Sequence, residues 1–318
     1  MTTATSEYLE RLLAGDRRAL SRVLRWIQEG EPEGREALRA LYPRTGRARI
    51  VGITGAAGSG KSTLTTALAR AERRRGHSVG IVAVDPSSAF TGGAILGDRI
   101  RMQELTDDPE VFMRSLATRG TLGGLSAEAT DIVAVLDAFG KDVVLVETVG
   151  AGQDEIEIAR TAQTTLLVLT PNTGDDIQAM KAGIMEIADI LVVNKADLPN
   201  AEILVSQLKA LLSYAEHHSD WQIPIVRTVA TRDEGIEELV KQIDAHEQYL
   251  RASGEGEQRA RDRARHQIAE AVRAELTRRF LQGDGRARLD QLVEQVAARA
   301  LDPRSAARAI IAEGQREG

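Results

Sequence analysis

A complete phosphate-binding loop restricts the fold of this chain more than any other feature of its sequence. Residues 55–63 read Gly-Ala-Ala-Gly-Ser-Gly-Lys-Ser-Thr, which fits the pattern G-x-x-x-x-G-K-[ST] at every fixed position. The apolar run Arg49–Thr54 precedes the loop, and a helical pattern begins at Lys61. A strand, a glycine-rich turn and a helix N-terminus in this order are typical of a mononucleotide-binding unit. The sequence therefore predicts a fold built around a nucleoside triphosphate site.

The loop residues have different expected roles in holding the triphosphate. Glycines let backbone N–H groups turn inward and approach the phosphates closely, and the following helix adds a partial positive charge at its N-terminus. We expect Lys61 to reach the β- and γ-phosphates and Ser62 to ligate Mg²⁺. The predicted phosphate-binding residues are Gly55, Ala57, Gly58, Ser59, Gly60, Lys61, Ser62 and Thr63.

A second motif, Asn194-Lys-Ala-Asp197, follows an apolar run and fits the N-K-x-D pattern of guanine recognition. A carboxylate can accept hydrogen bonds from both the ring N–H and the exocyclic amine of guanine, and adenine offers neither arrangement on that edge. A site built on such bonds rejects analogues that lack the donors. We expect Asp197 to select guanine, Lys195 to lie along the base and Asn194 to tie this loop to the phosphate loop. Capping of the next helix is the alternative role for Asp197.

Three acidic residues are candidates for the metal side of the site. Glu147 follows the apolar run Val143–Val146 in the segment Glu-Thr-Val-Gly150, where most guanine-nucleotide switches have Asp-x-x-Gly. A carboxylate there can hold Mg²⁺ directly or through water, and Gly150 would offer its N–H to the γ-phosphate. Asp85 and Asp98 are the other two candidates. The competing roles are a turn-capping acid at Glu147 and a helix N-cap at Asp85.

The group that would orient the attacking water is not at its usual place. Ras-like switches have a glutamine directly after the glycine of Asp-x-x-Gly, whereas this chain has Ala151 there and its nearest glutamine is Gln153. Because the attacking water needs an orienting group, we expect slow intrinsic hydrolysis that a bound partner accelerates.

Apolar runs alternate with helical patterns between residues 49 and 245. This alternation predicts a doubly wound, mostly parallel α/β sheet, in which ligands bind beyond the carboxyl ends of the strands. The expected strands are Ile50–Thr54, Ser78–Val84, Val111–Ser115, Val143–Val146, Thr165–Thr170, Ile190–Asn194 and Ile225–Val229. The expected helices between them are Lys61–Arg74, Leu125–Phe139, Ala201–His217 and Glu234–Leu250.

Helical segments flank this α/β region on both sides. Residues 6–42 have a helical pattern, with Asp16 as a predicted N-cap. The tail begins with a break at Ser253-Gly-Glu-Gly256, followed by a charged helix with an apolar stripe. A second break at Gly283-Asp-Gly285 precedes another helix, Leu289–Leu301, which ends before Pro303. A solvated, salt-bridged face and packing against a second subunit are the two interpretations of this tail. The expected division is an N-terminal helical extension (1–45), a P-loop GTPase domain (46–250) and a C-terminal helical dimerisation segment (251–318).

Composition argues against several other classes of protein. The net charge is −6 and the pI is about 5.6, which disfavours nucleic acid as the main partner. The chain has no cysteine, which excludes disulfides, thiolate catalysis and Cys-ligated metal sites, and its five histidines lack metal-ligand spacing. Its N-terminus does not resemble a signal peptide, and it has no apolar run long enough to span a membrane. We therefore expect a cytoplasmic protein without a membrane partner.

Six segments together resemble the MeaB/ArgK-type GTPases, within a similarity that spans roughly residues 15–250. They are Gly52–Thr63, Val82–Ser88, Gly97–Met102, Thr118–Gly124, Val146–Gln153 and Gly174–Lys181. The resemblance implies a SIMIBI-like GTPase that binds GTP or GDP with Mg²⁺. It also implies a chaperone that gates adenosylcobalamin loading and protects a B12-dependent acyl-CoA mutase, such as methylmalonyl-CoA mutase. The cobalamin would belong to the mutase. The family forms homodimers through a helical arm, and an adenosyltransferase is a further candidate partner.

The resemblance also assigns roles to individual residues. It implies metal ligands at Ser62, Asp85, Asp98 and Glu147, and catalytic residues at Lys61, Glu147, Gln153 and Lys181. It implies that the remaining nucleotide contacts come from Gly150, Asn194, Lys195, Asp197, Val229 and Ala230. A solvated helix lysine is the alternative interpretation of Lys181.

The chain departs from the family pattern in two places. Ala56-Ala57 occupy loop positions where prolines are common, and Thr228-Val-Ala230 stands where the family usually has a Ser-Ala pair that supports guanine. Neither change removes a side chain that the chemistry needs, and the second lies in the predicted base-contact loop.

Two other functions remain open at this point. A metallochaperone GTPase for nickel or cobalt commonly carries a His-rich or Cys/His segment, which this chain lacks. A P-loop kinase, the older label for this family, would leave Asn194 and Asp197 unexplained. Competition between ATP and GTP for bound GDP separates the kinase from the GTPase.

Overall fold

The computed structural model describes residues 3–85, 105, 107–117, 124–148, 160–171, 187–214, 220–281 and 284–314. The chain forms two compact units, Met1–Arg263 and Ala264–Gly318. The first unit contains the β-sheet, and the second is helical where it is described. The division into three segments at residues 45 and 250 stays a prediction.

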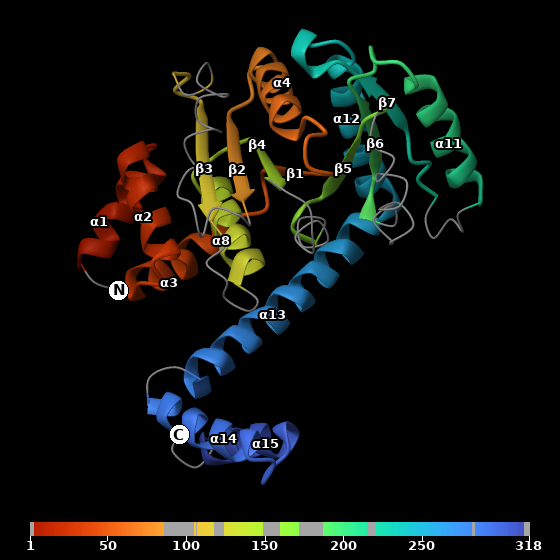
Figure 1. The fold of residues 1–318 in the computed structure, drawn as a ribbon. Helices are drawn as coiled ribbons and strands as arrows, with labels where there is room; N and C mark the ends of the chain where they lie inside the picture. Colours follow the sequence, from red (N-terminus) through yellow and green to blue (C-terminus); the bar gives the residue numbers. More distant parts are fainter. Residues whose placement is uncertain are drawn as a thin grey trace. The chain divides into compact units, whose positions relative to one another are not determined.

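The first unit is built on a seven-stranded sheet in the order β3-β2-β4-β1-β5-β6-β7, and all of its strand pairings are parallel (Figure 1). This confirms the predicted doubly wound α/β fold. The strands are β1 Arg49–Thr54, β2 Val79–Asp85, β3 Val111–Ala117, β4 Val143–Thr148, β5 Thr164–Leu169, β6 Ile190–Asn194 and β7 Ile225–Thr228. Each predicted strand is present; β6 has the predicted bounds, and no end of the other strands moves by more than two residues.

Helices cover both faces of the sheet because most of its strands are apolar on both sides. One face packs on α4 (Lys61–Arg74) and α12 (Ile236–Ser253). The other face packs on α8 (Gly124–Ala138) beside β2 and β4, and on α11 (Ala201–Tyr214) beside β6. Alternate residues supply the two cores; for example, Val192 faces the first and Val193 the second. Complete burial of β4, β5 and β6 is typical of parallel strands covered on both sides.

The N-terminal extension consists of α1 (Thr3–Leu13), α2 (Arg17–Gln28) and α3 (Pro32–Leu41), which share a core with α8. Asp16 is the N-cap of α2, as predicted: its carboxylate accepts hydrogen bonds from the backbone N–H groups of Arg18 and Ala19. The Arg17 guanidinium donates to the backbone carbonyls of Pro109 and Val111 at 2.7 and 2.8 Å. These contacts attach the helical extension to the start of β3.

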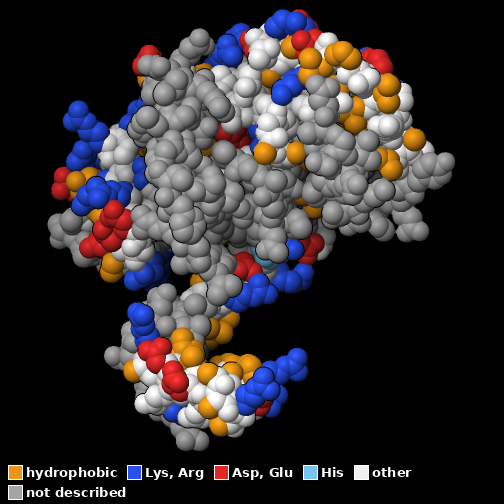
Figure 2. Space-filling view, viewed as in Figure 1, with side chains coloured by type: hydrophobic (Ala, Val, Ile, Leu, Met, Phe, Trp, Pro, Cys, Tyr) orange, Lys and Arg blue, Asp and Glu red, His pale blue; other side chains and the backbone are white. Residues whose placement is uncertain are grey.

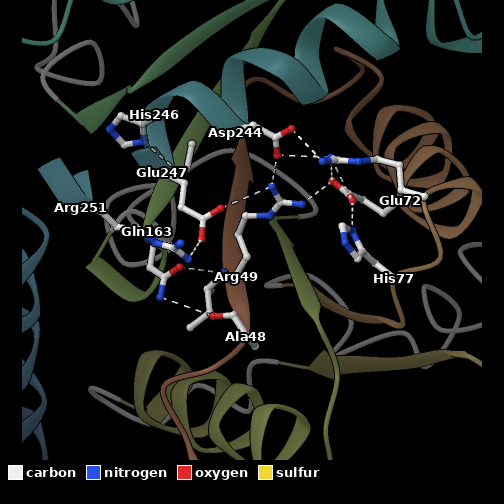
Figure 3. Close-up of polar contacts among 12 residues, drawn as sticks. Ala48, Arg49, Glu72, His77, Gln163, Asp244, His246, Glu247 and Arg251 are labelled. Atoms are coloured by element: carbon white, nitrogen blue, oxygen red, sulfur yellow. Dashed lines mark hydrogen bonds and ion pairs between the residues drawn. The ribbon is translucent and has the colours of Figure 1, made fainter. Parts of the chain in front are cut away.

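Buried ion pairs anchor the amino end of β1, at the edge of the sheet away from the phosphate loop (Figure 3). The Arg49 side chain is 8% exposed; it lies 2.7 Å from Glu72 of α4 and also pairs with Asp244 of α12. Glu247, one helical turn further along α12, lies 3.6 Å from the same guanidinium. The network therefore holds α4 and α12 against the strand that leads into the phosphate loop.

The C-terminal helices are α13 (Glu255–Leu281), α14 (Asp284–Ala297) and α15 (Pro303–Gly314). The predicted break at residues 253–256 is reduced to the turn at Gly254, whose φ of 74° ends α12. α15 begins at Pro303, beyond the last helix that the sequence predicts; proline is well tolerated at a helix start. The second unit contains an apolar groove of about 560 Å³ whose lining includes Leu276, Leu292 and Ile310. Hydrophobic side chains gather visibly on this unit (Figure 2). Within the described ranges, no helix combines the length and apolarity needed to span a bilayer.

Candidate functional site: a nucleotide-binding edge of the sheet

The phosphate loop leaves the carboxyl end of β1 and enters α4, as the sequence predicts. Gly55, Gly58 and Gly60 have φ values of 140°, 79° and 93°, a region that L-residues with side chains rarely adopt. The Lys61 ammonium is buried within the loop and donates to the carbonyls of Gly55 and Ala56 at 2.6 and 2.9 Å. The loop backbone therefore wraps around the Lys61 ammonium at the N-terminus of α4.

Neighbouring atoms leave no room for a side chain at two of these glycines. A Cβ on Gly55 would lie 2.2 Å from the carbonyl oxygen of Val168 in β5. A Cβ on Gly60 would lie 2.4 Å from Nδ2 of Asn194. By contrast, a Cβ on Gly58 would meet nothing within 4 Å. The loop is thus packed tightly against the strands of the second half of the sheet.

Asn194, the last residue of β6, joins the second motif to the phosphate loop. Its side chain is 2% exposed, and Nδ2 donates to the Ser59 carbonyl at 2.9 Å. Its Oδ1 accepts from the Thr228 hydroxyl at 3.1 Å and from the Ala230 N–H at 3.3 Å. One amide therefore fixes three segments that are far apart in the sequence, which is the geometry expected of it.

Lys195 and Asp197 lie on the turn that follows β6. Lys195 has a φ of 55°, and its ammonium donates to the Gly58 carbonyl at 2.8 Å, so its stem runs back toward the phosphate loop. The Asp197 side chain is 38% exposed and lies 3.5 Å from Nη1 of Arg232. Val229 and Ala230 are buried beside this turn, immediately after β7.

Glu147 sits one residue before the end of β4 and is fully buried. Its Oε2 accepts a hydrogen bond from the Thr65 hydroxyl on α4, one helical turn after Lys61. In the sheet, Glu147 is level with Ile53 of β1 and Ala83 of β2. The Glu147 backbone therefore lies between the strand that leads into the phosphate loop and the strand that ends at Asp85, and its carboxylate faces α4.

Three of the four residues predicted to bind metal, Ser62, Asp85 and Glu147, lie within the described residues. Ser62 lies in the first turn of α4, and Asp85 is the last residue of β2. Hydroxyl and carboxylate oxygens are ligands that Mg²⁺ prefers, so the chemistry of these residues fits that ion. The predicted residues Asp98, Gly150, Gln153 and Lys181 lie outside the described residues.

Two residues near the site were not anticipated from the sequence. Thr65 is four positions after Lys61, and this helical spacing could have placed it on the face of α4 toward β4. Arg232 is two positions after Ala230, but a charged residue in a turn normally indicates solvent exposure. The Glu234 carboxylate beside Arg232 raises the pKa of the guanidinium, with a smaller contribution from Asp197.

Comparisons with known proteins agree with this geometry. The family model described as Methylmalonyl Co-A mutase-associated GTPase MeaB matches residues 18–284. A Pyrococcus abyssi protein named as a GTPase is 45% identical over 310 residues, covering 96% of each chain. GTPase ArgK of Escherichia coli is 35% identical over 257 residues, covering 78% of each chain.

A solved structure and a mammalian relative extend the comparison. The crystal structure of an LAO/AO transport system kinase superposes with a TM-score of 0.74 at 27% identity and covers 99% of each chain. A mouse protein, methylmalonic aciduria type A homolog, mitochondrial, is 35% identical over 209 residues, which are 64% of this chain and 50% of that protein. The chain belongs to the MeaB family and is a P-loop GTPase.

Proposed function

We propose that this GTPase is a nucleotide-dependent chaperone of an adenosylcobalamin-dependent acyl-CoA mutase. The observation that carries the guanine-specific part is the Asn194 amide, which links the Asn-Lys-Ala-Asp turn to Ser59 of the phosphate loop at 2.9 Å. A kinase that binds only phosphates has no need of this connection. The family description and the name of the mouse relative support the mutase partner.

In this proposal the loop residues divide between phosphate and base. Lys61 exchanges its two carbonyl contacts for the β- and γ-phosphates, and loop N–H groups hold the remaining oxygens. Asp197 accepts from the two donors on the guanine edge, and Lys195 lies along the ring. Because the Ala230 N–H lies close to Asn194 at 3.3 Å, the segment after β7 closes the base pocket.

We assign Mg²⁺ to Ser62, Asp85, Asp98 and Glu147, directly or through water. The ion would neutralise charge on the phosphates during transfer to water. The hydrogen bond from Thr65 fixes one oxygen of Glu147 and thus the orientation of its carboxylate. The chain lacks a glutamine at the usual water-orienting position, so we propose slow intrinsic hydrolysis, with Gln153 and Lys181 as candidates for partner-dependent catalysis.

The C-terminal unit is proposed to form a homodimer. Its apolar groove and the exposed side chains of Val293 and Ile311, 51% and 44% exposed, would be covered by the second copy. Large exposed apolar patches commonly mark such contacts. Sedimentation of the whole protein tests this, and a monomer at micromolar concentration would contradict it.

The central experiment measures guanine selectivity and partner response. GTP, but not ATP, should displace labelled GDP, and Lys61→Ala should abolish nucleotide binding. Hydrolysis should accelerate when a purified B12-dependent acyl-CoA mutase is added. Equal displacement of labelled GDP by ATP would refute the assignment of this site to guanine nucleotides. Unchanged turnover with each acyl-CoA mutase tested would refute only the chaperone role.

The kinase title of the similar solved structure defines the second candidate. A kinase would transfer the γ-phosphate to a side chain or small molecule, whereas a GTPase releases it as inorganic phosphate. Stoichiometric phosphate release from GTP in buffer alone favours the GTPase.

A further inference from the structure

We propose that Arg232 is a positioning and specificity residue for guanine recognition. Its guanidinium lies 3.5 Å from the Asp197 carboxylate, and we infer that it holds this carboxylate in the orientation that pairs with both donors of guanine. This inference rests on the proposed role of Asp197 in base recognition.

Backbone hydrogen bonds fix the conformation of the turn that carries Arg232. The backbone N–H of Val229 donates to the Glu234 carbonyl at 3.0 Å, and the N–H of Glu234 returns to Val229 at 3.3 Å. Between them, Asp233 has a φ of 56°. Gly235, with a φ of 75°, closes the turn so tightly that a Cβ there would lie 2.0 Å from the Arg227 carbonyl oxygen.

Within this turn the Arg232 guanidinium is held on two sides. Its Nε and Nη2 atoms donate to the two carboxylate oxygens of Glu234 at 2.8 and 3.3 Å. This two-point contact fixes the plane of the guanidinium, and Nη1 lies 3.5 Å from the Asp197 carboxylate. Glu234 thus holds the Arg232 guanidinium in place, and Arg232 in turn holds the Asp197 carboxylate.

The neighbouring side chains leave this role to Arg232. Val229 has only carbon atoms in its side chain, so it cannot hydrogen-bond Asp197. Lys195 directs its ammonium to the Gly58 carbonyl instead. Among the residues that the structure describes, Arg232 is the basic side chain paired with Asp197. Arg232 therefore supports the Asp197 carboxylate from the turn that follows Thr228-Val-Ala230, the segment that differs from the family's usual Ser-Ala pair.

The same turn also contacts the phosphate-loop helix. The Asp233 carboxylate lies 3.6 Å from Arg74 and 3.9 Å from Arg70, both on α4. The turn is therefore positioned from two directions, by β7 and by α4. A substitution that removes only the Arg232 side chain should leave this backbone in place.

Removal of the Arg232 side chain should reduce the selectivity of the site for GDP over IDP. Inosine diphosphate keeps the ring N–H of guanine but lacks its exocyclic amine. A carboxylate can accept a hydrogen bond from the ring N–H alone in many orientations. To accept from both the ring N–H and the exocyclic amine of guanine, the carboxylate must have its plane aligned with the base edge. Loss of the Arg232 side chain should therefore weaken GDP binding more than IDP binding. Because Arg232 and Asp197 are 52% and 38% exposed, we expect the ratio of Kd(IDP) to Kd(GDP) to fall about two- to fivefold.

The experiment measures the dissociation constants of GDP and IDP for the full chain and its variants. Arg232→Ala is the test, with Arg232→Gln as a second variant. Arg227→Ala is the matched control, because this half-exposed arginine pairs with Glu202 and belongs to the strand that leads into the same turn. Asp197→Ala tests the proposed function separately, and it should remove most of the guanine preference.

Salt provides a readout that a purely structural role would not affect. An exposed ion pair is screened by salt, so the wild-type ratio should fall toward the Arg232→Ala value as NaCl increases, while the variant's ratio stays constant. An unchanged or increased ratio in both Arg232 variants overturns the inference, provided that Asp197→Ala still loses selectivity. If Asp197→Ala keeps the guanine preference, the proposed function of Asp197 fails and this inference fails with it.

Discussion

Replacing Asn194 with alanine should loosen the connection between the phosphate loop and the base-recognition turn. The change removes the donor to the Ser59 carbonyl at 2.9 Å and the acceptor for the Ala230 N–H at 3.3 Å. Both backbone groups lie in a buried region, where an unsatisfied donor or acceptor costs about 1–3 kcal/mol. The Thr228 hydroxyl also loses its acceptor, although it can rotate toward another. We expect the free energy of unfolding to fall by about 3 kcal/mol.

The assay pairs urea denaturation with titration of labelled GDP and IDP. Asn194 acts on the placement of the loops, so the affinities for both nucleotides should fall together, by about tenfold or more. Thr228→Val is the matched control: it keeps the shape and removes a single hydrogen bond at 3.1 Å, so it should lose about 1 kcal/mol of stability. A wild-type urea midpoint and wild-type GDP affinity in Asn194→Ala would refute the reasoning.

Three further predictions follow from local geometry and charge. Gly60→Ala should lose nucleotide binding because its Cβ would lie 2.4 Å from a side-chain amide; Gly58→Ala, whose Cβ meets nothing within 4 Å and which is strained only by its φ of 79°, should lose less affinity in the same titration. Burial, with a smaller contribution from a nearby glutamate, raises the pKa of Asp131 to about 7. Ionisation of this carboxyl therefore lowers the free energy of unfolding of the protein as pH rises from about 4 through about 7. Asp131→Asn should raise the free energy of unfolding by about 1–2 kcal/mol at pH 8 and by almost nothing at pH 4, as urea denaturation would show. Arg259→Ala should speed amide exchange at the start of α13, because this side chain donates at 2.8 Å to a buried carboxylate, whereas the exposed Arg261→Ala should not.

The sheet was predictable because its signals are local. Continuous apolar runs such as Val143–Val146 and Ile190–Val193 can be stable only when buried on both faces, and parallel strands provide that environment. The phosphate loop was equally predictable, since its glycines and Lys61 form a contiguous pattern. The first helix after it, Lys61–Arg74, has the predicted bounds.

Contacts between distant segments could not be derived in this way. The pairing of Thr65 with Glu147 depends on how α4 lies against β4, and that of Asp197 with Arg232 depends on the turn after β7. The sequence does not predict helix α15, because Pro303 is compatible both with the end of the preceding helix and with the first position of a new one. Pair contacts of this kind leave no periodic trace in a single sequence.

The position of Asn194 is determined partly from the opposite end of its strand. Asp189, just before β6, accepts from the Thr165 N–H and from Arg259, each at 2.8 Å, and its own carbonyl accepts from the Trp221 indole at 2.8 Å. These contacts fix the register of a buried strand only five residues long. A slip of one residue would turn each side chain to the other face of the sheet, and Asn194 would then face away from Ser59. The polar contacts at Asp189 therefore help to place the guanine-recognition turn, although they lie about 16 Å away along the strand.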